Sequence, residues 1–262
     1  MSSESHTHRL VPKYIMSRRT FAAAGAGAAA VAVIQKGSAQ DASPEASSEN
    51  PAANYPMTAF NVYAVGLHCA KEDPMMQMEA HHFCQVLDSG VIQCAVFDGG
   101  EVGAKLMGVE YLISGEMFDA LPHEEHQYWH PHNYEIVSGV LGAPDMTDED
   151  ELGLMTALVN SYGKTWHTWH TGRPDGVGAP GDDVPMGPPM LQWSFNRDGE
   201  ADQSLVDSMS ERLGIDFDAK REARQELVAS MTPQEGVDDL KDAFPNADPE
   251  PPTGVEDAGT DH

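Results

Sequence analysis

The residues with the clearest capacity for chemistry lie between 129 and 135, in the stretch "WHPHNYE". Because a residue that precedes proline favours an extended backbone, His130 and His132 are expected to project from the same side of the chain. Glu135 follows three positions later and can add a carboxylate oxygen. Imidazole and carboxylate groups are ligands of zinc and related ions, so the stretch predicts a site for a divalent transition metal.

A further ligand is expected from the histidine pair in "EAHHFC" (79–84). Neighbouring residues of a strand point to opposite faces, so only one of His81 and His82 can face a site shared with His130 and His132. A structural alternative stays open, because histidines beside Trp and Tyr are often half-buried rings whose nitrogens bond to backbone or carboxylate groups.

No known catalytic signature accompanies these histidines. The sequence has no G-x-S-x-G elbow, no P-loop, no G-x-G-x-x-G directly after an expected strand and no H-E-x-x-H helix. It therefore indicates no reaction, and whether the protein is an enzyme stays open.

Several strands must position these residues. Residues 79–97 predict a hairpin whose strands flank Asp88, Ser89 and Gly90, a connection typical of antiparallel pairs. Alternating or short apolar runs predict further strands at 105–113, 133–142, 164–170 and 189–195.

Helices are expected between and after the strands. Ser114 is a candidate cap for a short helix through Leu121, and Thr147 opens the clearest helix, which Gly163 is expected to end. Residues 202–230 have a charged helical pattern with a break near Gly214. The fold class is therefore α+β, mainly antiparallel sheet with interspersed helices and a helical C-terminal extension.

The three cysteines, Cys69, Cys84 and Cys94, lack the spacing of a zinc knuckle or a disulfide framework. Two interpretations stay open: three small buried side chains, or one bridge between Cys84 and Cys94 in an oxidising compartment.

The charge distribution is strongly uneven. The chain carries 42 acidic and 15 basic residues, a formal charge of −27, and five of the basic residues lie in the first 40 positions. Such a surface repels nucleic acid phosphates, so nucleic acid is not expected as a partner. Concentrated salt would screen the self-repulsion, so the composition indicates a halophilic protein.

The first 40 residues resemble a twin-arginine export signal. Arg18 and Arg19 form the paired-arginine core, and residues 22–34 supply a weakly apolar stretch that small residues follow. These 13 residues span about 20 Å as a helix, less than the roughly 30 Å hydrocarbon core. The prediction is export by the twin-arginine translocation machinery to the cell envelope or exterior, with no permanent membrane span after cleavage.

Composition divides the rest of the chain into three parts. Residues 41–53 are rich in Pro, Ser and Ala and predict a disordered linker, and residues 54–230 form the expected α+β domain. Residues 231–262 have few large apolar residues after about 245 and predict an acidic, largely disordered tail.

Several segments in order, among them "EAHHFCQVL", "YWHPHNYEIVSGVL" and "LVNSYGKTWHTW", resemble the plant oil body-associated proteins and their microbial relatives. The resemblance spans roughly residues 55–225. It implies association with lipid droplets for the plant members, and it implies no reaction and no catalytic residues. The export signal and the acidity of this chain depart from that family.

Two functions follow as expectations. The first is an exported, non-catalytic protein that binds a lipid, a small apolar ligand or another protein. The alternative is a metal-binding protein or metal-dependent enzyme that uses the histidine and glutamate cluster.

Overall fold

The computed structural model describes residues 55–259, so the predicted export signal (1–40) and linker (41–53) lie outside the described residues. Within this range, seven strands form one sheet in which every pairing is antiparallel. The strands are β1 (Val62–Ala70), β2 (Asp73–Val86), β3 (Ile92–Phe97), β4 (Leu106–Ser114), β5 (His130–Pro131), β6 (Ser161–His167) and β7 (Met190–Trp193).

One 3₁₀ helix precedes β1, and the other helices connect the later strands and extend the chain beyond them. The α-helices are α2 (Gly115–Asp119), α3 (His123–His126), α4 (Asn133–Val137), α5 (Asp148–Leu158), α6 (Gln203–Leu213) and α7 (Phe217–Ala223), and the 3₁₀ helices are η2 (Pro56–Ala59), η3 (Gln225–Ser230) and η4 (Lys241–Ala243). Among the residues described here, no helix has the length and apolar character needed to cross a membrane.

The sheet closes into a barrel because β4, at one edge, also pairs with β6. The ring runs β1, β2, β3, β4, β6, β7 and returns to β1 where Cys69 lies opposite Trp193. The short strand β5 pairs with β6 beside β7, which places His130 opposite Gly163. The mixture of helix and antiparallel sheet is as the sequence predicted, but the closure is a more specific architecture that the strand patterns did not predict.

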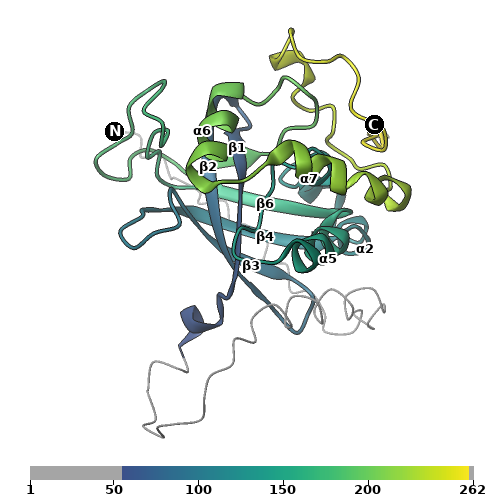
Figure 1. The fold of residues 1–262 in the computed structure, drawn as a ribbon, viewed down its shortest axis with the longest axis horizontal. Helices are drawn as coiled ribbons and strands as arrows, with labels where there is room; N and C mark the ends of the chain where they lie inside the picture. Colours follow the sequence, from purple (N-terminus) through teal and green to yellow (C-terminus); the bar gives the residue numbers. More distant parts are fainter. Residues whose placement is uncertain (1–54, 260–262) are drawn as a thin grey trace, which may run out of the picture.

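The helices cover the outside of this barrel. Figure 1 shows α2 and α5 together at one end of the barrel, while α6 and α7 lie along one side. The main apolar core lies between the outer face of the strands and these helices, and includes Val65, Leu67, Leu154, Leu205 and Met209. The alternate side chains of each strand point into the barrel interior, where Cys84, Cys94 and Leu112 belong to the same apolar core.

The predicted helix boundaries are partly confirmed. Ser114 and Thr147 cap α2 and α5 through their side-chain oxygens, and Gly214 ends α6 in the left-handed region at φ 66°. Gly163 does not end a helix, because α5 stops at Leu158 and Gly163 lies within β6.

The strand predicted at 133–142 is wrong, because residues 133–137 form α4. All five residues of this helix are buried. A short segment buried on every side has no polar face, so its apolar run cannot distinguish a helix from a strand.

The disordered tail predicted for 231–262 is corrected over residues 231–259, which fold against the body. Val237, Leu240, Phe244 and Val255 are buried in the main core. These anchors are spread among prolines and acids, so the composition of the segment hides them.

Cys84 and Cys94 lie opposite each other on β2 and β3 and form a disulfide, which settles the alternative that the sequence left open. Cys69 is a buried free thiol.

Removing this bridge as the double variant Cys84→Ala/Cys94→Ala is expected to lower the free energy of unfolding by about 2–3 kcal/mol, because a bridge between residues 10 positions apart restricts the unfolded chain. Urea denaturation of both proteins measures the difference. A reducing agent should destabilise the wild type by a similar amount and leave the variant unchanged. Equal sensitivity of the two proteins to the reductant would contradict the expectation.

Candidate metal centre

Seven titratable side chains gather in the barrel interior, and each is at most 6% exposed. Five of them lie on strands, one follows β5 and one lies in α4: His68, His82, Glu110, His130, His132, Glu135 and His167. Contacts between His82 of β2 and Glu110 of β4, and between His68 of β1 and His167 of β6, join strands that are not neighbours in the sheet. The side chains therefore meet across the interior of the barrel.

Glu110 lies at the centre of this cluster. Its Oε1 is 3.3 Å from Nε2 of His130 and 3.6 Å from Nε2 of His132. Its Oε2 is 2.8 Å from Nε2 of His82. Glu135 lies beside the cluster, with Oε2 4.0 Å from Nε2 of His132.

Glycines on the barrel strands make the space that these side chains occupy. A Cβ on Gly163 would lie 2.6 Å from Nε2 of both His130 and His132 and would also collide with Glu110 Oε1. A Cβ on Gly66 would lie 2.7 Å from Oε1 of Glu135. Three potential ligand atoms therefore converge on a point beside Gly163 that only glycine leaves free.

Hydrogen bonds fix which nitrogen of His132 faces this point. The Ser161 hydroxyl donates to the Leu158 carbonyl oxygen at 2.7 Å, so it must accept from Nδ1–H of His132, 2.8 Å away. Nε2 of His132 is then unprotonated and directs its lone pair towards Glu110 and Gly163. This is the tautomer that binds a metal, oriented by an outer hydrogen bond.

The folded C-terminal segment holds the same turn in place. The side-chain oxygen of the buried Gln234 accepts from the backbone N–H groups of His132 and Asn133 at 3.2 and 2.9 Å. Its amide nitrogen donates to the Ser161 carbonyl oxygen at 2.8 Å. Gln234 lies in the segment predicted to be disordered, and it thus connects that segment to His132 and to Ser161, the residue that orients the His132 ring.

Burial and charge determine the protonation states. Burial alone would raise the pKa of Glu110, but the facing imidazoles of His82, His130 and His132 hold it well below its usual range. Burial alone would lower the pKa of His82, but the Glu110 carboxylate offsets this effect and raises that pKa above its usual value. Glu110 is therefore ionised at neutral pH.

The other histidines of the cluster whose pKa is shifted are neutral at neutral pH. Burial lowers the pKa of His130, lowers that of His68 well below its usual value, and lowers that of His167 to about 3. Burial also raises the pKa of Glu135 to about 7. The neutral His130 imidazole beside the ionised Glu110 carboxylate is in the ligand state that a transition metal requires.

We expect the metal-free protein to lose stability as the pH falls from 6.5 towards 3. In that window the unfolded chain protonates His68, His130 and His167 while the folded protein does not, so acid favours unfolding by roughly 1.4 kcal/mol per pH unit for each fully shifted histidine. Glu135 opposes this between pH 7 and about 4.5, because its raised pKa makes the folded state take up a proton first.

Taken together, these effects should lower the free energy of unfolding by on the order of 2 kcal/mol per pH unit between pH 6 and 5. Urea denaturation at pH 7.5, 6 and 5 in the presence of a chelator measures it. If the urea concentration at the midpoint of unfolding stays constant over this pH range, the assigned protonation states are contradicted.

The structure brings four of the predicted ligands together: His82, His130, His132 and Glu135. His81 does not join them, because it points out of the barrel and contacts the Tyr63 hydroxyl at 2.7 Å and Glu79 Oε1 at 2.6 Å. The alternation of the strand therefore separates the two adjacent histidines, as the sequence predicted, and His82 is the one inside.

Sequence reasoning missed Glu110, His68 and His167. Glu110 sits between Val109 and Tyr111, which are exposed, so the acid is on the buried face of β4. An acid at the buried position of an alternating strand was the available signal. His68 has no such signal, because it stands in the nearly continuous buried run of β1.

The fold and the cluster define the class of protein: a closed antiparallel barrel with a histidine- and carboxylate-lined interior. Residues 54–228 match the family described as "protein of unknown function (DUF1264)", so the chain belongs to this family. No solved structure matches the chain.

Curated relatives carry the name of oil body-associated proteins. Oil body-associated protein 1A of Zea mays is 35% identical over 167 residues, which cover 64% of this chain and 67% of the relative. Protein 2B of Zea mays is 37% identical over 62% of this chain and 60% of its own length, and protein 1B of Arabidopsis thaliana is 28% identical over 64% and 66%. The matches thus span about three fifths to two thirds of these relatives.

Proposed function

We propose that this protein binds a divalent transition metal inside the barrel, with Glu110, His130 and His132 as ligands and Glu135 as a neighbouring fourth group. One observation carries the proposal: three potential ligand atoms converge beside Gly163, where a Cβ would collide with all three. The three ligand atoms lie within 4.8 Å of one another, a spread that small side-chain shifts can close around one ion.

The donor set limits the kind of metal. Imidazole nitrogens and carboxylate oxygens suit zinc, iron, nickel or manganese. Thiolate chemistry is not supported, because Cys84 and Cys94 are joined in a disulfide and burial raises the pKa of the Cys69 thiol above its usual range. Three protein ligands with a carboxylate nearby leave a position for water or a further ligand, so both a structural ion and a reactive ion are compatible with the site.

Metal analysis of protein purified without chelators tests this proposal. We expect close to one equivalent or more of a transition metal, and a rise in melting temperature when Zn²⁺ is added to the stripped protein. Less than a tenth of an equivalent, with no stabilisation by Zn, Fe, Ni or Mn, would refute it.

A second role, contact with an apolar surface, is favoured by the outside of the barrel. Leu106, Val109 and Tyr111 of β4 are 50%, 40% and 41% exposed. Leu106 and Val109 line an open apolar groove of about 410 Å³, together with Gly108, Trp166, Thr168 and Pro189. The relatives are named oil body-associated proteins, and a surface that meets lipid fits that name.

Flotation with triacylglycerol droplets coated with phosphatidylcholine tests this second role. Val109→Asp should reduce the droplet-bound fraction several-fold, because a charge enters the apolar groove. Val177→Asp is the matched control, since Val177 is also exposed (51%) but lies outside the groove lining. Equal flotation of both variants, or no flotation of the wild type, would refute it.

We further propose that the protein is exported through the twin-arginine route to the cell envelope or exterior. The sequence of residues 17–39 and the Cys84–Cys94 disulfide support this location, since disulfides persist in oxidising compartments. Because the metal ligands are buried inside a closed barrel, loading the ion during folding and exporting a folded protein is a coherent order of events. A fusion of residues 1–45 to a reporter, compared with Arg18→Lys/Arg19→Lys, tests the route.

The proposed halophilic character predicts a strong dependence of folding on salt. The formal charge is −27, and at 0.01 M salt the Debye length is about 30 Å, so like charges closer together than this repel one another with little screening. Dilute buffer should therefore destabilise the fold. Circular dichroism in 2 M and 0.01 M KCl measures the effect. Unchanged thermal stability after the salt is removed would contradict the prediction.

A further inference from the structure

We propose that the barrel holds a second metal ion, bound by His68, His82 and the other oxygen of Glu110, so that Glu110 bridges two ions. This inference rests on the proposed function and extends it from one ion to a pair. The two sets of potential ligands, His68–His82–Glu110 and Glu110–His130–His132, share only Glu110.

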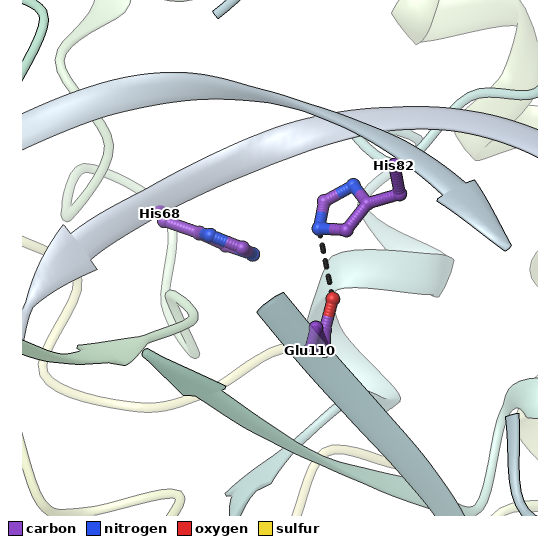
Figure 2. Close-up of side chains that lie close together, drawn as sticks. All are labelled: His68, His82 and Glu110. Atoms are coloured by element: carbon purple, nitrogen blue, oxygen red, sulfur yellow. Dashed lines mark ion pairs between the residues drawn. The ribbon is translucent and has the colours of Figure 1, made fainter. Parts of the chain in front are cut away.

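The two oxygens of Glu110 face different histidines. Oε1 faces His130 and His132, as described above, while Oε2 lies 2.8 Å from Nε2 of His82. Figure 2 shows His82 and His68 directed from two strands towards the end of the Glu110 side chain. The three potential ligand atoms of this second set also lie within 4.8 Å of one another. The five residues do not form one group of that size, whereas the Glu110 carboxylate belongs to both sets.

A chain of hydrogen bonds fixes His68 in the metal-binding tautomer. The Met78 sulfur can only accept, so Nδ1 of His167, 3.1 Å away, carries the proton that it donates. Nε2 of the neutral His167 must then accept from Nδ1–H of His68 at 3.3 Å. Nε2 of His68 is therefore unprotonated and free to bind a metal. His167 does for His68 what Ser161 does for His132, orienting the ring from the outer side.

Buried polar atoms without partners support the presence of a ligand here. Among the described residues, Nδ1 of His130, Oγ1 of Thr165 and Oε1 of Gln192 are buried with no hydrogen-bond partner. Thr165 of β6 lies opposite Glu110 of β4 and opposite Gln192 of β7. All three residues therefore stand on the strand faces that hold the cluster. Uncompensated polar atoms at one place in a protein interior point to bound water or ions.

The positive charge of two metal ions calls for a further negative group at the site. Two divalent ions bring four positive charges, against one negative charge each from Glu110 and Glu135. A metal-bound water would supply a hydroxide by releasing its proton, because metal ions strongly acidify bound water, and this would reduce the excess positive charge. Two ions that share a carboxylate and a hydroxide would lie about 3.5–4 Å apart.

Titration of the metal-stripped full chain with Co²⁺, followed by its visible absorption and by metal analysis after desalting, tests the second position. The wild type should bind two equivalents, and His68→Gln should bind one. His81→Gln is the matched control, a buried histidine outside the barrel interior, and should keep two equivalents. X-ray absorption of the wild type should show metal–metal scattering at about 3.5–4 Å, which needs no variant to fold.

The outcomes separate the two proposals. One equivalent in the wild type, without metal–metal scattering, would overturn the second position and leave the proposed function intact. No binding in the wild type would overturn both. Two equivalents that persist in a folded His68→Gln would overturn the assignment of His68 and place the second ion elsewhere.

Discussion

Gly163→Ala should lower the affinity for Zn²⁺ by at least about 100-fold, the upper end of what loss of an outer-sphere partner costs a metal site. The new methyl group would occupy the point 2.6 Å from Nε2 of both His130 and His132 on which the ligand atoms converge. It would displace the ion rather than only weaken one bond. Competition with a chromophoric chelator measures the affinity.

The fold should survive this substitution, because the atoms that the methyl group meets are the ends of side chains and not backbone. Gly142→Ala is the matched control. It is also buried, and the nearest atoms to its new Cβ would be the Ile215 side-chain end at 3.2 Å and atoms of Glu151 and Val65 at 3.9 Å, none of which belongs to a proposed ligand. A Gly163→Ala protein that is folded and binds Zn²⁺ as the wild type does would show that the ion, if any, lies elsewhere.

Glu110→Gln should remove metal binding from both proposed positions, leaving less than a fifth of an equivalent per chain. The carboxylate is the only ligand common to the two sets, and a neutral amide with one oxygen can neither bridge two ions nor balance their charge. The pKa of His82 should fall, because the charge that raises it is gone. Metal analysis and histidine NMR titration measure the two effects.

Glu79→Gln provides a closely matched control for this variant. Glu79 is a buried carboxylate that pairs with His81 and Arg212 on the outer face of β2. Its loss should cost stability without changing the metal content. If both glutamine variants retain the metal of the wild type, Glu110 is not a ligand; if both lose it, the effect of Glu110→Gln reflects damage to the fold.

The sequence was sufficient for those parts of the fold that local rules determine. The caps Ser114 and Thr147 and the left-handed Gly214 act on neighbouring backbone atoms, so their residue types alone indicate them. Barrel closure depends on a pairing between β4 and β6, about 50 positions apart, and no periodicity records it. Gln234 reaches the site from a segment whose composition predicted disorder, because burial there relies on a few separated anchors.

In the candidate site, too, the residues fixed by local sequence were predictable and those brought in by long-range strand pairing were not. His130 and His132 were predictable because Pro131 and their spacing fix a local geometry. Strand alternation predicted that only one of His81 and His82 would join them, without indicating which. His68 and His167 come from strands that meet only across the closed barrel. Glu110 was visible in principle as an acid on the buried face of a strand. Its role as the shared group depends on long-range closure.

Anomalous diffraction from crystals grown with one equivalent of Zn²⁺, measured on both sides of the zinc absorption edge, tests the metal-binding account most directly. A peak is expected within about 2.0–2.2 Å of Nε2 of His130, Nε2 of His132 and Oε1 of Glu110, beside Gly163. A barrel interior without an anomalous peak, with zinc bound only at surface groups such as His123, would contradict it.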